Sequence, residues 1–298
     1  MDRARYSMPA TRRPIARLSV IAALLVASAC GGAFAMLWAF RNPVTHAWLV
    51  SRGVLERRGL SLDNEQENPV AIACPKHAQV VLIAGQSNAA SHGESKGKFT
   101  PNVVNYYQGK CYAARDPLLG ATGRNGSVWS RLAWRGPVVL APVAIGQTRL
   151  SSWAPGGRLW PRITESIDEL ESLGLPVNYV IWHQGEADAE EATDPVVYRQ
   201  ALERLIRSIK ARAKTATVIV SPGTYCLGLS SPAIVAAQRA GARDAGALIG
   251  PETDLLGSAY RHDGCHFNNA GLEAVARMWG RYAGVLPIAP KTPSAPAA

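Results

Sequence analysis

The chain has 298 residues, 47% of them hydrophobic, which is enough for one domain of ordinary size with a buried core and a short appendage. Its formal net charge is +10. Residues 1–17 hold five arginines against one aspartate, and the remaining excess is spread along the chain without a basic run, so a nucleic-acid partner is not expected.

The first 40 residues predict a membrane anchor. Residues 18–40 carry no charged side chain, and a helix of this length spans roughly 34 Å at 1.5 Å per residue, enough to cross a hydrocarbon core. A cleaved signal peptide is the alternative, because small residues around Cys30 suit a signal peptidase and Cys30 could carry a lipid, but its apolar region would be shorter. The basic tail of residues 1–17 places the N-terminus in the cytoplasm and the rest of the chain on the periplasmic or extracellular side.

Residues 41–73 mix polar and apolar side chains and are interpreted as a juxtamembrane linker, and residues 289–298 as a disordered tail. Between these segments, in residues 74–288, short apolar runs alternate with helical patterns. The runs mostly lack the alternation of a half-exposed sheet, which predicts strands buried on both faces. The expected strands are Gln79–Ala84, Val138–Ala144, Tyr179–Trp182, Thr217–Val220 and Ala247–Ile249.

Amphipathic helices are predicted to cover this sheet. Apolar residues recur on one helical face in Leu159–Leu170, where Pro161 lies in the first turn, and again in Tyr198–Ile209. A last helix is expected after Asn269. Strands and helices that alternate in this way predict a doubly wound parallel sheet, whose ligands bind beyond the carboxyl ends of the strands.

Ser87 follows the first expected strand, inside the run Gly-Gln-Ser-Asn at residues 85–88. Serine at such a turn is commonly only a helix cap, so a nucleophilic role requires partners elsewhere in the chain. These partners are a histidine that takes the serine proton and a carboxylate that orients the histidine. His266 follows Asp263 by three residues just before the last helix, and residues three apart in a tight turn can point to the same side. Ser87, His266 and Asp263 are therefore predicted to form a catalytic triad.

Two other strand ends carry candidates for an oxyanion hole. Acyl transfer needs hydrogen-bond donors aimed at the oxygen that becomes negative. Gln184 can supply a side-chain amide and Gly146 a backbone N–H, although a glycine after a strand is usually only part of a turn.

The motifs Gly-Gln-Ser-Asn, Trp-His-Gln-Gly-Glu-Ala-Asp at residues 182–188 and Asp-Gly-Cys-His-Phe at residues 263–267 occur in this order. Together they resemble the SGNH hydrolase superfamily, and specifically the sialate O-acetylesterase-like carbohydrate esterases, over roughly Cys74 to Leu286. The resemblance implies a flavodoxin-like three-layer α/β/α sandwich with a five-stranded parallel sheet, here preceded by the transmembrane helix.

For the site, the resemblance implies the triad on Ser87, His266 and Asp263, with no metal or other cofactor. It also implies an oxyanion hole from the backbone N–H groups of Ser87 and Gly146 with the side chain of Gln184. The family branch often has Gly-Gly-Ser/Thr in its second motif, whereas this chain has Ile-Gly-Gln-Thr at residues 145–148.

Other residues near the motifs are given supporting roles. Glu186 and Asp188 could be the paired carboxylates of a glycosidase, but because a serine triad is available elsewhere, Glu186 is interpreted as a brace for the Ser87 turn. His183 is interpreted as a structural histidine. The supporting or substrate-binding set is Gln86, Asn88, Gly185, Glu186, Arg149 and Trp153.

Four cysteines lie beyond the apolar segment, without the close spacing of zinc or redox motifs. Two disulfides are expected outside the cytoplasm, and three pairings are possible. We prefer Cys74 with Cys111 and Cys226 with Cys265, because the loop after the fourth strand and the loop of the triad would share one rim of the sheet.

The sequence thus predicts a membrane-anchored esterase that removes O-acetyl groups from a carbohydrate through an acyl-enzyme intermediate. Its partners would be an acetylated carbohydrate and, through the N-terminal helix, the cytoplasmic membrane. An O-acetyltransferase that uses the same triad is one alternative, and a non-catalytic glycan-binding module is the other.

Overall fold

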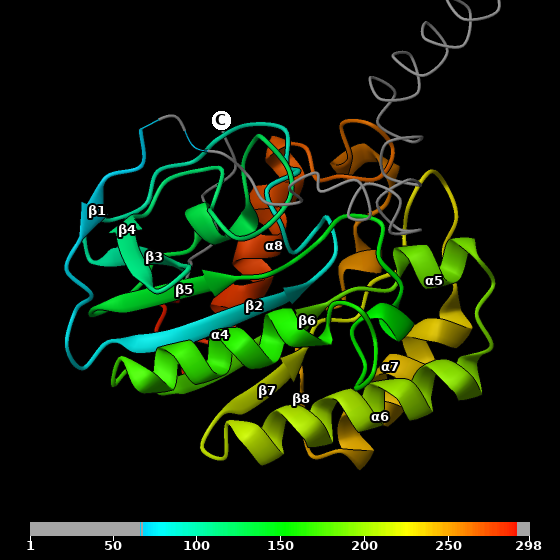
Figure 1. The fold of residues 1–298 in the computed structure, drawn as a ribbon. Helices are drawn as coiled ribbons and strands as arrows, with labels where there is room; N and C mark the ends of the chain where they lie inside the picture. The colour runs from blue at the N-terminus through cyan, green and yellow to red at the C-terminus, as the bar shows by residue number, and fades with distance from the viewer. Residues whose placement is uncertain (1–65, 67, 291–298) are drawn as a thin grey trace, which may run out of the picture. The chain divides into compact units, whose positions relative to one another are not determined.

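The computed structural model describes residues 66 and 68–290, all within the compact unit Leu49–Ala298. Figure 1 shows a twisted sheet with α4 (Trp160–Ser172) and α6 (Pro195–Arg212) on one face and α8 (Asn269–Gly280) on the other. This part of the chain is therefore a three-layer α/β/α sandwich.

The sheet has eight strands in the order β1-β4-β3-β5-β2-β6-β7-β8. In this spatial order, neighbouring strands from β3 through β5, β2, β6 and β7 to β8 pair in parallel. The β3–β4 and β4–β1 pairs at one edge are antiparallel. The central strand β2 lies between β5 and β6, so the chain order reverses there and the carboxyl end of β2 is the switch point at which such sheets bind ligands. The strands are β1 (Ala71–Ile72), β2 (Gln79–Gly85), β3 (Val103–Tyr107), β4 (Lys110–Ala113), β5 (Val138–Pro142), β6 (Val177–His183), β7 (Thr217–Val220) and β8 (Leu248–Ile249).

α6 and α8 begin at residues whose side chains accept from free N–H groups of the first turn. The Asp194 carboxylate accepts from two N–H groups of the first turn of α6, and the Asn268 side chain accepts from Gly271 N of α8. Proline lies in the first turn of α4, α6 and α7, where it costs no hydrogen bond. The remaining helices are α5 (Glu186–Glu190), α7 (Pro232–Asp244) and the 3₁₀ turns η1 (Val128–Arg131), η2 (Leu150–Ser152), η3 (Thr253–Leu255) and η4 (Ser258–Tyr260).

The core lies on both faces of the sheet, because successive side chains of each strand point to opposite sides. On the α8 face, Val81 and Ile83 of β2 belong to one buried cluster with Trp129 of η1 and Trp279 of α8. The two tryptophan rings are 6.0 Å apart. Trp279 lies near the end of α8, and Phe267 and Leu272 at its start belong to the same cluster, so this packing positions both the helix and the loop that precedes it.

The prediction of a five-stranded sheet is wrong. The five strands expected from apolar runs correspond to β2, β5, β6, β7 and β8, but β3, β4 and β1 extend the sheet to eight strands. β3 went unrecognised because Asn105 interrupts its apolar residues; the buried Asn105 side chain instead bonds Leu119 N at 2.7 Å and the Leu119 carbonyl at 3.2 Å. β1 and β4 are too short for a periodic pattern.

The membrane-spanning part of the predicted fold gains no support. Residues 1–65, which include the predicted tail, the anchor at residues 18–40 and most of the linker, lie outside the described residues. Within residues 66 and 68–290, no helix is long and apolar enough to cross a membrane. The short strand β1 falls in residues 41–73, the segment predicted to be a linker. Of the C-terminal tail predicted for residues 289–298, all but two residues lie outside the described part.

Candidate active site

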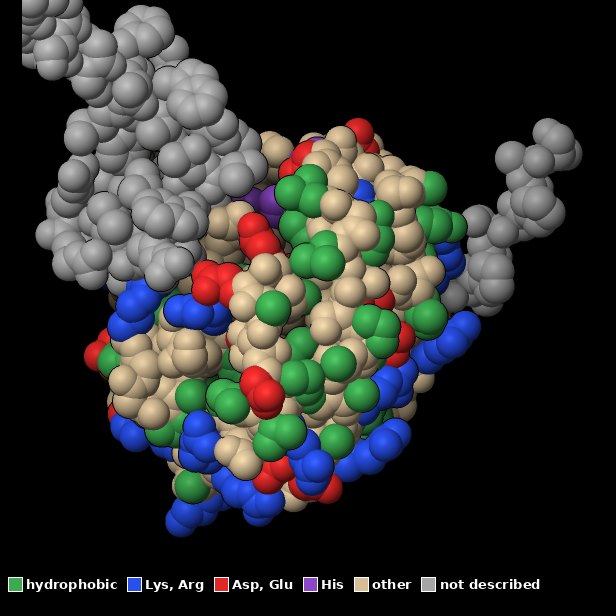
Figure 2. Space-filling view, turned by 90° about the vertical axis from the view of Figure 1, so that its right-hand side faces the viewer, with side chains coloured by type: hydrophobic (Ala, Val, Ile, Leu, Met, Phe, Trp, Pro, Cys, Tyr) green, Lys and Arg blue, Asp and Glu red, His purple; other side chains and the backbone are tan. Residues whose placement is uncertain are grey.

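The predicted site residues follow strands that end at one edge of the sheet. Ser87 comes directly after β2, Gly146 follows β5 and Gln184 follows β6, while Asp263 and His266 lie in the loop before α8. In Figure 1 the arrows of β2 and β5 point toward this edge, and Figure 2 looks onto it.

The turn after β2 is tight and buried. Gly85 has φ +133°, and a Cβ there would lie 1.9 Å from the carbonyl oxygen of His183, so only glycine fits. The N–H groups of Ala89 and Ala90 both donate to the Gln86 carbonyl, which turns the chain back within four residues. Ser87 is 3% exposed at the tip of this turn.

Asp263 and His266 form the pair that the sequence predicted. The Nδ1 atom of His266 lies 2.6 Å from Oδ2 of Asp263, while Oδ1 accepts from the backbone N–H groups of His266 at 2.7 Å and Cys265 at 3.0 Å. Burial by itself would raise the pKa of Asp263, but the hydrogen bonds from His266 and Cys265 outweigh it and hold the pKa well below its usual range. The carboxylate therefore stays charged and fixes the ring of His266.

This loop docks against the segment that follows Ser87. Phe267 O accepts from Glu94 N at 2.9 Å, and the Asn88 amide lies 3.4 Å from Cys265 O. The same amide donates to Oε1 of Glu186 at 2.7 Å. The structure thus joins the Ser87 turn, the predicted brace Glu186 and the Asp263–His266 loop in one network.

His92, Thr122 and Arg261 belong to the site although the sequence reasoning did not identify them. The His92 ring stacks on His266 with centroids 4.9 Å apart, and its Nε2 lies 3.0 Å from Thr122 Oγ1, which accepts from Gly146 N at 2.8 Å. Arg261 is buried against the Phe267 ring and donates to Cys265 O at 2.8 Å. The contacts of His92 and Thr122 join residues far apart in the chain, whereas these two contacts of Arg261 are with residues four and six positions away.

Gln184 is fully buried and satisfied by the protein. Its Nε2 lies 2.7 Å from Asp188 Oδ2, 3.0 Å from Thr148 O and 3.2 Å from Gln86 Oε1, and its Oε1 accepts from Tyr198. An amide has two hydrogens, so these acceptors already occupy them. The oxyanion role predicted for Gln184 finds no support in this pattern, which favours a structural role.

Gln184→Ala is therefore expected to lower the stability by about 2 to 3 kcal/mol, because it strips a donor from the buried Asp188 carboxylate and an acceptor from Tyr198. The rate per folded molecule should fall less than tenfold. Urea unfolding and the ester hydrolysis rate are to be measured on the same preparation. An unchanged midpoint with a rate loss on the order of 10² to 10³ would restore Gln184 as the oxyanion donor.

The other supporting residues divide into buried and peripheral ones. Gln86 Oε1 accepts from the start of α5, including Ala187 N at 3.2 Å. Trp153 is fully buried with its Nε1 donating to Thr148, so it packs in the core and does not line a cleft. Arg149 pairs with Glu191 at the surface. His183 is buried, and burial lowers its pKa to about 4, so it is neutral and structural.

The backbone conformation of Gln147 supports the assignment of Gly146 to the second motif. Gln147 has φ +52°, in the left-handed region that favours glycine. The resembled motif Gly-Gly-Ser/Thr has its second glycine at this position, and a glycine adopts a positive φ readily.

Both predicted disulfides are confirmed. Cys74 is bonded to Cys111, which lies in β4, and Cys226 is bonded to Cys265 in the loop of Asp263 and His266. Gly264 O also accepts from Leu227 N at 2.8 Å. The loop after β7 and the loop of Asp263 and His266 therefore share one rim, as expected.

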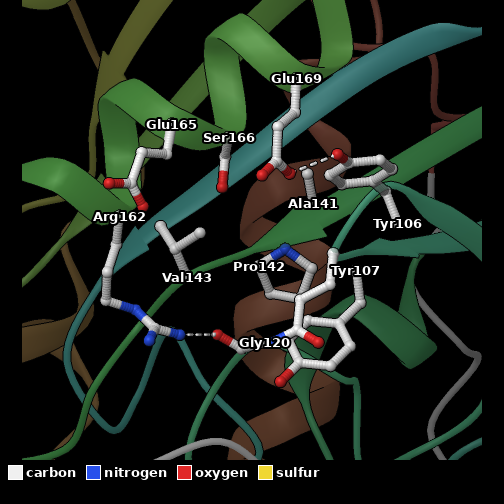
Figure 3. Close-up of a pocket in the computed structure, with 11 residues that line it drawn as sticks. Tyr106, Tyr107, Gly120, Ala141, Pro142, Val143, Arg162, Glu165, Ser166 and Glu169 are labelled. Atoms are coloured by element: carbon white, nitrogen blue, oxygen red, sulfur yellow. Dashed lines mark hydrogen bonds between the residues drawn. The ribbon is translucent and has the colours of Figure 1, made fainter. Parts of the chain in front are cut away.

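A pocket of about 130 Å³ opens at the carboxyl ends of β3 and β5, against α4. Figure 3 shows Glu165 and Ser166 reaching into it from α4, with the Tyr107 ring on the opposite wall. Arg162 donates to the carbonyl oxygen of Gly120 at 2.9 Å, and Gly120 lies two residues before Thr122 in the chain. The pocket thus combines hydrogen-bonding groups with an aromatic face, but Ser87, Asp263 and His266 are not among the residues that line it.

Known proteins resemble this chain in sequence and in fold. A family model described as carbohydrate esterase, sialic acid-specific acetylesterase matches residues 126–282. A curated protein of Arabidopsis thaliana named "Probable carbohydrate esterase" is 31% identical over 71 residues, which is 24% of this chain and 27% of that protein. The match thus spans only about a quarter of the length of that relative.

Two solved structures share the fold. A protein of Arabidopsis thaliana has a TM-score of 0.55 at 17% identity, with 70% of this chain and 98% of that chain covered. NanS has a TM-score of 0.51 at 14% identity, with 70% of this chain and 100% of that chain covered. The family match covers more than half of the chain and contains Gln184, Asp263 and His266, but it begins after Ser87.

Proposed function

Because the chain belongs to the carbohydrate esterase family of sialic acid-specific acetylesterases, we propose that it hydrolyses O-acetyl esters of a carbohydrate with Ser87 as the nucleophile. The family points to a carboxylic ester hydrolase. The observation that carries the proposal is the Asp263–His266 pair, 2.6 Å apart, in a loop bonded to the segment that follows Ser87.

In this mechanism the Ser87 hydroxyl attacks the acetyl carbonyl while His266 takes its proton. Asp263 stabilises the imidazolium that forms. Collapse of the tetrahedral intermediate expels the sugar oxygen, which takes the proton from His266, and leaves the acetyl group on Ser87. Water, deprotonated by His266, then releases acetate and restores the serine.

The oxyanion is assigned to backbone N–H groups. Gly146 N donates to the Thr122 hydroxyl at 2.8 Å, so a substrate oxygen would replace this hydroxyl when it enters. The Ser87 N–H is the second donor in the proposal. Because the Gln184 amide is engaged elsewhere, it holds the strand end that faces these donors.

The carbohydrate class rests on the family match. The pocket beside β3 and β5, which the triad residues do not line, offers carboxylates, hydroxyls, a guanidinium and the flat Tyr107 ring, groups that match a sugar surface. Placement of the domain outside the cytoplasm is also part of the proposal, because two disulfides persist in oxidising compartments.

The purified protein is expected to release acetate from p-nitrophenyl acetate and from acetylated polysaccharides. The assay is run with and without unacetylated acceptor sugars, and both free acetate and acetylated acceptor are measured. Acetylated acceptor formed at the expense of free acetate would make the chain an acetyltransferase. Glycan binding without any ester cleavage would make it a binding module.

A further inference from the structure

The triad loop is a short hairpin that places two histidines opposite each other on its two strands. Arg261 and Phe267 form an antiparallel bridge, and His262 N donates to His266 O at 2.9 Å. His262 and His266 are therefore opposite neighbours, with ring centroids 6.1 Å apart. The Cys226–Cys265 disulfide ties this hairpin to the loop after β7.

Asp263 completes a set of three metal-ligand side chains. One ligand atom from each of His262, Asp263 and His266 lies within 4.8 Å of the other two. His262 and Asp263 are exposed and His266 is partly exposed, so an ion in solution can reach them. Figure 2 shows histidine side chains at the surface of this face of the molecule, with acidic side chains nearby.

We propose that this hairpin binds one divalent transition-metal ion, best matched by Zn²⁺, and that the ion reversibly inhibits the esterase. Imidazole and carboxylate are ligands that zinc prefers, with bonds of about 2.0 to 2.2 Å. In tetrahedral geometry such bonds place ligand atoms roughly 3.3 Å apart. The three side chains need only close inward on a hairpin whose backbone is already held by the bridge and the disulfide.

Zinc would inhibit the esterase because one of its ligands, His266, is the general base of the proposed mechanism. A ring nitrogen of His266 that binds zinc has given its lone pair to the metal, and a carboxylate oxygen of Asp263 bound to zinc no longer orients the ring. His266 then cannot accept the Ser87 proton. The inhibitory step rests on the proposed function, whereas binding of the ion does not.

Binding is tested on the full chain after treatment with a chelator and its removal, by titrating ZnCl₂ against a chromophoric zinc indicator. His262→Gln keeps a donor for the His92 carbonyl, which His262 contacts at 3.2 Å, but removes a metal ligand. His77→Asn is the matched control, because His77 is exposed outside the hairpin and has φ +58°, which asparagine tolerates.

The wild type is expected to bind one zinc ion with a dissociation constant on the order of micromolar, His77→Asn to match it, and His262→Gln to bind at least tenfold more weakly. Equal zinc affinity in His262→Gln and the wild type, or no binding by the wild type at millimolar zinc, would overturn the site. These results do not depend on any esterase activity.

The activity arm uses p-nitrophenyl acetate with the same three proteins. Saturating zinc should lower the wild-type rate more than tenfold, and chelator should restore it. His262→Gln should keep its metal-free rate within twofold and need at least tenfold more zinc for half inhibition. Stoichiometric zinc binding with an unchanged wild-type rate would refute the inhibition, and an inactive metal-free wild type would refute the proposed function instead.

Discussion

Replacing Ser87 by alanine is expected to lower the rate of acetyl ester hydrolysis by a factor on the order of 10³ to 10⁶ while the protein stays folded. His266→Ala should give a similar loss, because the members of a triad act as one unit and neither works without the other. Asp263→Asn should cost about 10⁴, since the amide no longer stabilises the imidazolium or fixes the ring by the 2.6 Å bond. The measurement is kcat/KM on p-nitrophenyl acetate, with circular dichroism as the check on folding.

Ser91→Ala is the matched control for Ser87→Ala. Ser91 is also buried, four residues further along, but its hydroxyl accepts from Leu118 N at 3.1 Å and faces no triad member in the contacts described. Its replacement should lower stability by about 1 to 3 kcal/mol without a comparable loss of rate per folded molecule. Turnover close to wild type in Ser87→Ala would remove the nucleophile from the proposal, and a loss in Ser91→Ala of the same size would show that the Ser87 effect reports on packing.

The strands that carry the site could be predicted because burial on both faces leaves a continuous apolar run. β2, β5 and the second half of β6 have this signature, and the predicted site residues Ser87, Gly146 and Gln184 follow their ends. The antiparallel edge had no such signature, because β4 alternates exposed and buried residues over only four positions. α7 has a weak apolar pattern because Ala237, Gly241 and Ala242, which are small, form half of its buried face, although Ser231 and Pro232 mark its start.

Local chemistry in the site was predictable, and contacts across the fold were not. Asp263 and His266 are three residues apart, so their pairing could be inferred from a single turn. The stacking of His92 on His266 and the bond from Gly146 to Thr122 join distant segments, and one sequence holds no signal for either. Gln184 is predicted to serve the oxyanion because a polar residue at a strand end has no evident packing role in the sequence, whereas its four buried partners in the structure favour a structural role.

Removing the Cys226–Cys265 disulfide is expected to abolish most of the activity before the fold is lost. The bond closes a loop with a sequence separation of 39, which in the chain-entropy model contributes about 4 kcal/mol to stability. It also pins the hairpin of Asp263 and His266 to the loop after β7, so its loss frees the triad loop while the sheet remains packed. The esterase rate and far-UV circular dichroism are followed on one sample as reductant is increased, and on Cys226→Ser/Cys265→Ser.

The second disulfide provides the control for this prediction. Cys74–Cys111 closes a loop with a similar sequence separation, 37, but joins the β4 edge of the sheet, away from the strands that end at the site. Cys74→Ser/Cys111→Ser should therefore lose a similar amount of stability and keep most of its rate per folded molecule. If both double variants lose activity alike, or if rate and circular dichroism fall together in the reductant titration, the hairpin is positioned by packing of Phe267 and α8, and the covalent tie does not hold the triad.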